Sequence, residues 1–261
     1  MTHPPAVRPF AVAALSVAVL LTVAACAADG RGAPRPSATS PVAARTAVAE
    51  PPPAAPPALT EDQARAALIT EADLGTPWVP TRGTATWRDE LLKATADVPD
   101  CGHLLDALYT EDVLGGDAPA PRAVTALDDA YDGAQLHYRV TAHRAADVDR
   151  VLARLGALPD TCARFRAVGA GGDVRPVQVT GIPLPDVGDA RQGLRVTLSG
   201  RTADGGPALL TVDLAAVRVG DDAITLTHGG LGEVSGEATW RAVEAGALRL
   251  AEVRRLGRVQ V

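Results

Sequence analysis

An apolar run over residues 10–25 ends where a polar, proline-rich segment begins. The run is shorter than the roughly 20 apolar residues that a membrane-spanning helix needs. A run of this length close to the N-terminus is typical of the hydrophobic core of a signal peptide. We therefore expect residues 1–25 to be removed and the fold to be built from the residues that follow.

The run closes on Val23-Ala24-Ala25-Cys26, a branched apolar residue, two small residues and a cysteine. This pattern resembles the bacterial lipobox, in which the cysteine becomes the lipidated N-terminus of a lipoprotein. We expect Cys26 to carry diacylglycerol and a further acyl chain such as palmitate, because two or more chains anchor a protein stably. The expected location is the outer face of the cytoplasmic membrane. The alternative is a plain secretory signal with an incidental Cys26, since Arg8 is the only Lys or Arg before the run.

Residues 26–59 are rich in alanine and proline and show no apolar periodicity. Such a composition cannot bury a core and is typical of a disordered tether. The hydroxyls of Ser37, Thr39 and Ser40 leave a glycosylated stalk as an alternative. Residues 60–261 are then expected to form one folded domain.

The charge of the chain bears on its partners. The formal net charge is -6, and removal of Arg8 with the signal peptide takes it to -7. An acidic protein repels nucleic acid and anionic lipid headgroups alike. We therefore expect no nucleic-acid partner and contact with the membrane only through the lipid anchor.

Apart from Cys26, the sequence contains two cysteines, Cys101 and Cys162. In an oxidising compartment outside the cytoplasm, an even pair predicts a disulfide. The pair lacks the ligand spacing of a zinc site, and no Cys-x-x-Cys motif is present. The sequence therefore favours a bridge from Cys101 to Cys162.

Helix signals mark the first half of the domain. Thr60 and Gln63 form a capping-box pattern that predicts a helix to about residue 70, followed by an extended segment through Trp87. Asp100 is expected to cap a second helix. A third helix is predicted by apolar residues at helical spacing, and the pattern resumes beyond Pro159, which either kinks this helix or starts another. These residues are Val148, Val151, Leu152 and Leu155, then Cys162 and Phe165.

The second half of the domain is dominated by strand patterns. Period-two alternation and tight-turn residues predict six strands, at 122–127, 134–141, 174–180, 193–200, 208–219 and 223–228. Tight turns join the last three, which are expected to form an antiparallel meander, followed by a helix that Ser235 caps. This helix is expected to turn Trp240, Val243, Ala247 and Leu250 inward. The predicted fold is α+β, with a mainly antiparallel sheet of about six strands packed against helices.

The sequence offers little catalytic chemistry. Ser199 lies outside any Gly-x-Ser-x-Gly motif, and the domain has no His-Glu-x-x-His motif. The histidines lie on separate predicted elements, at His103, His137, His143 and His228. The glycine-rich stretch at 169–172 is expected to follow a helix and precede a strand, which is the wrong order for a phosphate loop. We therefore expect no catalytic residue, no metal and no cofactor.

One strand face carries the weak candidates for ligand binding. The strand at 134–141 alternates an apolar face with a polar face that bears Gln135, His137, Arg139 and Thr141. A solvated sheet face has this composition by default, and that interpretation is favoured over a ligand site. A rival hypothesis is an envelope enzyme with a carboxylate pair drawn from Asp186, Asp189, Asp213, Asp221 and Asp222. A purely structural envelope protein is a third possibility.

Several short motifs occur in an order that resembles one family. They are Ala72-Asp73-Leu74 with Trp78, Pro99-Asp100-Cys101, Cys162-Ala163-Arg164-Phe165, Pro185-Asp186-Val187-Gly188-Asp189 and Val217-Arg218-Val219-Gly220-Asp221. Together they cover nearly all of residues 60–261. The domain resembles the PknH-like extracellular sensor domains of actinobacterial receptor kinases and related lipoproteins.

The resemblance implies an α+β fold with a cleft for an unidentified ligand, and it supplies no catalytic residue. Kinase-linked members carry two disulfides, whereas this domain has cysteines for one and the sequence includes no kinase domain. The function we expect is a membrane-anchored extracytoplasmic lipoprotein. Its sensor-like domain would bind a small molecule or another envelope protein.

Overall fold

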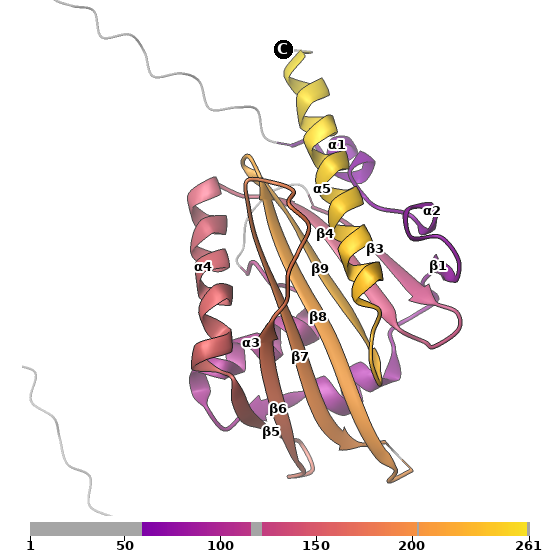
Figure 1. The fold of residues 1–261 in the computed structure, drawn as a ribbon, viewed down its shortest axis with the longest axis vertical. Coiled ribbons are helices and arrows are strands. Elements are labelled where there is room, and N and C mark those ends of the chain that lie inside the picture. Colours follow the sequence, from indigo (N-terminus) through magenta and orange to yellow (C-terminus); the bar gives the residue numbers. More distant parts are fainter. Residues whose placement is uncertain (1–58, 116–121, 203, 260–261) are drawn as a thin grey trace, which may run out of the picture. The chain divides into compact units, whose positions relative to one another are not determined.

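The computed structural model describes residues 59–115, 122–202 and 204–259. Their strands form one antiparallel sheet in the order β1-β3-β4-β9-β8-β7-β6-β5-β2, and helices pack on it (Figure 1). This is the predicted α+β class, although the sheet has nine strands rather than about six. The signal peptide, Cys26 and the tether up to residue 58 lie outside the described residues. Leu59, the last residue of the predicted tether, is buried in the domain.

Most elements near the N-terminus are short, and the last strands of the chain are long. The helices are α1 Glu61–Ala66, α2 Glu71–Leu74, the π-helix η1 Arg88–Leu92, α3 Pro99–Thr110, α4 Ala145–Thr161 and α5 Gly236–Val259. The strands are β1 Trp78–Pro80, β2 Ala94–Ala96, β3 Arg122–Asp129, β4 Gln135–Ala142, β5 Arg164–Gly169, β6 Val174–Gly181, β7 Ala190–Arg201, β8 Pro207–Val219 and β9 Asp222–Leu231. The predicted meander of the last three strands is confirmed, because β7, β8 and β9 are consecutive neighbours in the sheet, and β6 extends it by one strand.

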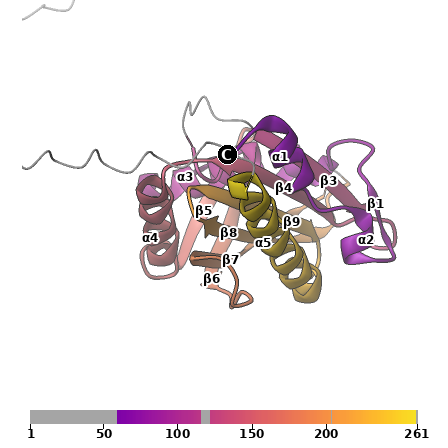
Figure 2. The same ribbon diagram turned by 90° about the horizontal axis from the view of Figure 1, so that it is seen from above.

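The sheet separates two hydrophobic cores. Along β8, Leu210, Val212 and Leu214 belong to one core, while Ala215 and Val217 belong to the other. Since successive side chains of a strand point to opposite faces, the two cores lie on opposite sides of the sheet. Helix α4 packs against β6, β7 and β8, and α5 packs against β8 and β9 (Figures 1 and 2).

The first core joins α3, α4 and η1 to the sheet, and it contains the disulfide. Cys101 in the first turn of α3 is bonded to Cys162 at the C-terminal end of α4, with 5.8 Å between their Cα atoms. Both cysteines are buried. The predicted bridge is thus present, and it ties two helices that are distant in sequence over the same face of the sheet.

The second core lies under α1, α2 and α5. Gly246, in the middle of α5, allows a close approach, because a Cβ atom there would fall on the Tyr138 hydroxyl of β4. That hydroxyl donates a hydrogen bond to the carbonyl of Ala67, 3.3 Å away. Val243, Ala247 and Leu250 point inward as predicted, but Trp240 does not, since it is 41% exposed.

Helix starts follow the sequence signals at two of three places. Thr60 and Gln63 form the predicted capping box, although α1 ends at Ala66 rather than near residue 70. The Ser235 hydroxyl accepts a hydrogen bond from the Ala238 amide at the start of α5. The predicted Asp100 cap is wrong. Val98 occupies that position and Pro99 begins α3, which suits proline because the first helical amide needs no partner.

The region after Pro159 differs most from the prediction. Helix α4 continues through Pro159 to Thr161 without restarting, and Phe165 lies on strand β5 rather than on a helix. A buried residue just after a helix and another on the next strand can imitate helical spacing, because both face the same core. The glycine-rich residues 169–172 therefore connect β5 to β6. They follow a strand, contrary to the prediction, and still precede no helix.

Candidate functional site

A polar cavity lies on one face of the sheet over β3, β4 and β9. Its volume is about 290 Å³, and its rim includes Glu111 just beyond α3 and Thr81 just beyond β1. The floor consists of two cross-strand rows that the register of the three strands sets. One row is Ala126, His137 and Thr227, and the other is Val124, Arg139 and Thr225. We call this hollow the polar cavity.

The three weak sequence candidates all lie on the strand face toward the polar cavity. The side chains of His137 and Arg139 line it and are 19% and 22% exposed. Gln135 is buried next to His137 and does not line the cavity. The face is therefore not the freely solvated surface that the sequence favoured.

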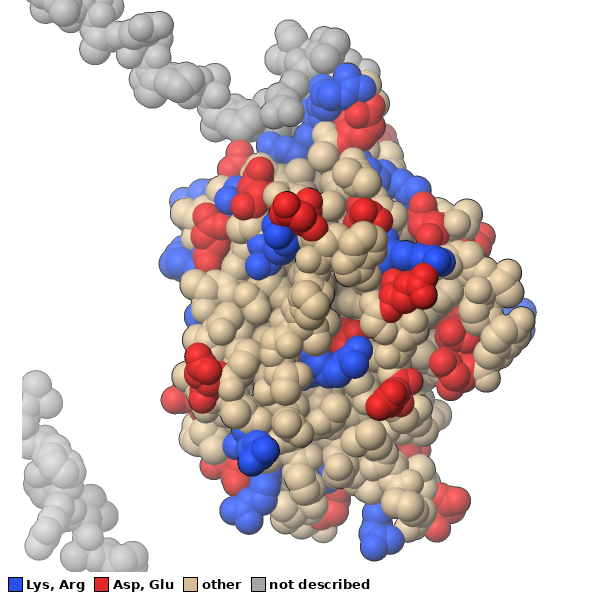
Figure 3. All heavy atoms as spheres, in the orientation of Figure 1, with Lys and Arg blue, Asp and Glu red and all other residues tan. Residues whose placement is uncertain are grey.

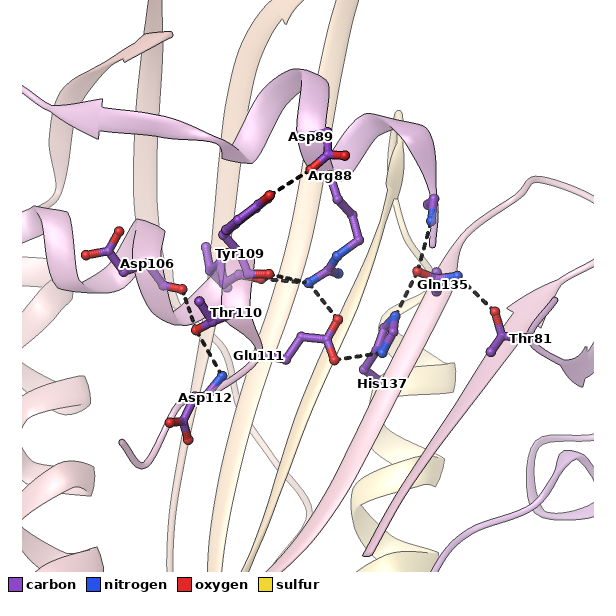
Figure 4. A network of polar contacts seen from close by, with 12 residues as sticks. Thr81, Arg88, Asp89, Asp106, Tyr109, Thr110, Glu111, Asp112, Gln135 and His137 are labelled. Carbon is purple, nitrogen blue, oxygen red and sulfur yellow. Dashed lines mark hydrogen bonds and ion pairs between the residues drawn. The ribbon is translucent and has the colours of Figure 1, made fainter. Parts of the chain in front are cut away.

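A buried ion pair forms one wall of the cavity. Arg88, from η1, lies 2.8 Å from Oε1 of Glu111 and also donates to the carbonyl of Leu108. The other carboxylate oxygen of Glu111 lies 2.8 Å from Nδ1 of His137. Figure 4 shows Glu111 between Arg88 and His137, so that a single carboxylate contacts side-chain nitrogens from two elements.

Gln135 fixes the orientation of His137. Its amide nitrogen donates to Thr81, to the Gly83 carbonyl and to Asp128, at 2.7–3.1 Å. Its amide oxygen is therefore the atom that faces Nε2 of His137 at 2.7 Å, and it also accepts from the amide of Ala85 (Figure 4). Because an amide oxygen only accepts, we assign a proton to Nε2 of His137.

The backbone of Glu111 is unusual. Its φ of 61° is left-handed, and it is the one positive φ outside glycine in the described residues. A position of this kind at a helix C-terminus is usually glycine, because a Cβ atom there is strained. Glu111 supplies instead the carboxylate that joins Arg88 to His137. Such strain is a feature of functional sites when the surroundings hold it in place.

The surroundings of Glu111 also set its charge. Burial raises the pKa of Glu111, but the hydrogen bond from His137 and the charges of His137, Arg88 and Arg139 outweigh burial and bring the pKa below its usual value. Glu111 is therefore a carboxylate at neutral pH. Its two oxygens already contact nitrogens of Arg88 and His137.

Two polar groups of the floor, one in each row, are less well paired. Among the described residues, Arg139 forms an ion pair with Asp112, in which Nη1 of Arg139 lies 3.7 Å from Oδ1 of Asp112. Thr227 is 3% exposed, and its hydroxyl has no hydrogen-bond partner within the described part of the chain. The cavity thus contains polar groups that the protein itself satisfies poorly.

Sequence reasoning missed half of this site. Glu111 and Arg88 carry no signal, because their roles arise from the end of α3 and the start of η1, both distant from β4 in sequence. Thr225 and Thr227 did leave a signal, since they alternate with the buried Ile224 and Leu226 along β9.

The other candidate residues are held elsewhere. Asp213 is fully buried and pairs with Arg195, while Asp222 pairs with Arg254 at the opposite end of β8 and β9. Asp186 and Asp189 pair with Arg191 and Arg218 in turns, and the Asp221 side chain accepts from the amide of Ala145. On the face shown in Figure 3, acidic and basic side chains are interspersed.

The histidines are dispersed in the same way. His228 contacts Thr239 across the face opposite the cavity, and His103 lies on α3. Within residues 59–115, 122–202 and 204–259, no three His, Cys, Asp or Glu residues form a group that could hold a metal ion. Over the same residues, no helix has the length and apolar character needed to cross a bilayer.

No protein-family model and no curated protein matches the sequence. Among solved structures, the extracellular domain of PknH from Mycobacterium tuberculosis is 14% identical, over 77% of this chain and 100% of that one, with a TM-score of 0.48. A Mycobacterium smegmatis protein described as an Rv0999 ortholog has the same identity and coverage and a TM-score of 0.39. A Rhizobium leguminosarum protein is 12% identical, over 52% of this chain and 98% of that one, with a TM-score of 0.25. The structural relationship to these proteins is distant.

Proposed function

We propose that the chain is an extracytoplasmic, lipid-anchored binding module with a sensor-like domain, and that the polar cavity is its ligand site. The lipobox pattern at Cys26 and the tether support the anchor, and the disulfide suits an oxidising compartment. One observation carries the ligand site. The floor of a single cavity contains both Arg139 and Thr227, two polar side chains that the protein itself satisfies poorly.

The energetics favour a ligand at this position. A buried hydroxyl without a partner costs about 1–3 kcal/mol, and hydrogen bonds to a charged group contribute about 1.5–3 kcal/mol. A ligand that bonds to Thr227 and to Arg139 recovers both contributions at once. Small-molecule sites commonly combine a concave shape with a few convergent polar groups in this way.

We favour binding over turnover because the acid–base pair of the cavity is already engaged. Both nitrogens of His137 have partners, Gln135 and Glu111. Both oxygens of Glu111 have partners as well, Arg88 and His137. A general acid or base needs an atom within hydrogen-bond reach of the reacting group. In this pair, the nitrogens and oxygens are already hydrogen-bonded to protein groups.

Native mass spectrometry of the full chain, purified in detergent from its own host, tests the proposal. We expect a retained small molecule in the wild-type protein. We expect Ala126→Leu to lose it, because Ala126 lies on the cavity floor and leucine fills the space. The matched control is Ala107→Leu, in a separate groove of about 520 Å³ between α3 and α4, which should keep the molecule.

Two results would overturn the proposal. One is loss of the retained molecule only in Ala107→Leu, which would move the site to the groove between α3 and α4. The other is a wild-type protein that carries no molecule and converts envelope substrates, which would make the chain an enzyme.

A further inference from the structure

We propose that the ligand of the polar cavity is a small monoanionic carboxylate, held by the guanidinium of Arg139 and by the threonine hydroxyls of β9. This inference rests on the proposed function and adds the chemical class of the ligand. It follows from the protons that the cavity walls hold, from their charges and from the register of the strands.

The protons come first. Nε2 of His137 carries a proton, because it faces the amide oxygen of Gln135 at 2.7 Å. Nδ1 of His137 lies 2.8 Å from Glu111, and this contact also needs a proton. The two residues therefore share one proton more than a neutral histidine and a carboxylate would hold. With Glu111 ionised, the protons on both ring nitrogens leave the pair with no net charge.

The charge balance then depends on Arg139. The charged side chains that line the cavity are those of Glu111, His137 and Arg139, and the first two cancel. Just outside this lining, Arg88 adds a positive charge behind Glu111, and Asp112 a negative charge at the rim. Asp128 lies beyond Gln135, to which it is hydrogen-bonded. With these outer groups included, the charges sum to zero, but Arg139 is the cation that faces the cavity space, and its contact with Asp112 at the rim is long at 3.7 Å, so its guanidinium favours an anion.

The register places neutral donors beside this charge. Thr225 lies directly opposite Arg139 on the neighbouring strand, and Thr227 lies opposite His137. Directly opposite residues of an antiparallel pair have Cβ atoms about 4.5–5.5 Å apart. One carboxylate can therefore contact the guanidinium with one oxygen and a threonine hydroxyl with the other. Arginine suits this role because its planar N–H groups match the geometry of a carboxylate.

The rest of the cavity limits the ligand further. Val124 and Ala126 form the apolar side of the floor along β3, which suits a short hydrocarbon part. The lining offers one positive charge, that of Arg139, beyond the neutral pair of Glu111 and His137, so it matches one negative charge and not two. A monoanion with a short apolar group satisfies both constraints, whereas inorganic phosphate, which is partly dianionic at neutral pH, satisfies neither.

Isothermal titration of the dialysed full chain in dodecyl maltoside, at pH 7 and constant ionic strength, tests this inference. The probes are butyrate, its neutral isostere butyramide, and inorganic phosphate. We expect butyrate to bind most tightly. We expect Arg139→Gln to weaken its binding about tenfold or more, as the loss of a hydrogen bond to a charged group implies. The matched control is Arg241→Gln, on the exposed side of α5, which should bind butyrate like the wild type.

Several outcomes would overturn the inference. They are equal binding of butyramide and butyrate, tighter binding of phosphate, no binding of butyrate, or unchanged binding in Arg139→Gln. The proposed function stands in each of these cases if Ala126→Leu still loses the molecule retained from the host. That variant fills the cavity and does not change its charge. Butyrate binding that is unchanged in Ala126→Leu would instead contradict the proposed function, because the ligand would then bind outside the polar cavity.

Discussion

The guanidinium of Arg88 lies 2.8 Å from the carboxylate of Glu111, and this contact fastens η1 to the end of α3. Arg88 is only 3% exposed, and it donates as well to the carbonyls of Leu108 and Tyr109. Burial lowers the pKa of Arg88, although the charges of Glu111 and Asp89 act against this shift. A buried cation of this kind depends on its counter-charge, so the wall of the polar cavity depends on Glu111.

We expect Glu111→Gln to lower the free energy of unfolding by about 2–3 kcal/mol. Removing one partner of a buried ion pair costs about 3–5 kcal/mol, and the two carbonyl partners of Arg88 soften that loss. The control is Glu237→Gln, which breaks an exposed pair with Arg241 and should change stability by less than about 1 kcal/mol. Urea denaturation measures both, and equal effects of the two variants would contradict the role of Glu111.

His228 should make stability depend on pH. Burial lowers the pKa of His228 to about 4, although the charge of Asp213 acts to raise it. The unfolded chain takes up this proton near pH 6.5. The contribution to stability is therefore complete above pH 6.5 and is lost as the pH falls toward 4, by about 3 kcal/mol in total.

The variant His228→Asn isolates this contribution. Nδ1 of His228 donates to the hydroxyl of Thr239, which in turn donates to Asp213, and asparagine can keep the first of these bonds. We expect the difference in unfolding free energy between wild type and variant to shrink steadily between pH 6.5 and 4. A difference that stays constant over this range would show that His228 does not titrate as its burial implies.

The disulfide should contribute strongly to stability. Cys101 and Cys162 are 61 positions apart, and a bridge over such a loop stabilises a domain by up to about 4 kcal/mol. We expect reduction to lower the urea midpoint of the wild-type protein. The double variant Cys101→Ser with Cys162→Ser should unfold at the lower midpoint with or without reductant. A wild-type midpoint that does not respond to reductant would contradict this expectation.

Cys26 should decide where the protein is found. We expect Cys26→Ala to abolish lipid attachment and to move the protein out of the membrane fraction. Membrane fractionation and metabolic labelling with a fatty acid measure the two effects. The variants at Cys101 and Cys162 serve as controls, because those cysteines lie in the folded domain and should not alter fractionation. Unchanged membrane association of Cys26→Ala would rule out the lipid anchor.

Local patterns in the sequence predicted the elements that depend on local physics. The capping box at Thr60 needs only residues three positions apart, and the alternation along β4 needs only the pleat of a strand. Strand β5 was missed because Cys162 and Phe165 face one core from two different elements. The inward position of Trp240 was also wrong, because helical spacing does not say how wide the buried stripe of α5 is.

By itself, the sequence determined that β4 has one apolar and one polar face, and that Cys101 and Cys162 form the available pair in the domain. Only the tertiary structure decided that the polar face is half-buried and that Arg139 lies opposite Thr225. The physical reason is that side-chain alternation is set within one strand, whereas cross-strand register and the position of a helix end depend on how the whole sheet packs. Glu111 reaches His137 through that packing alone.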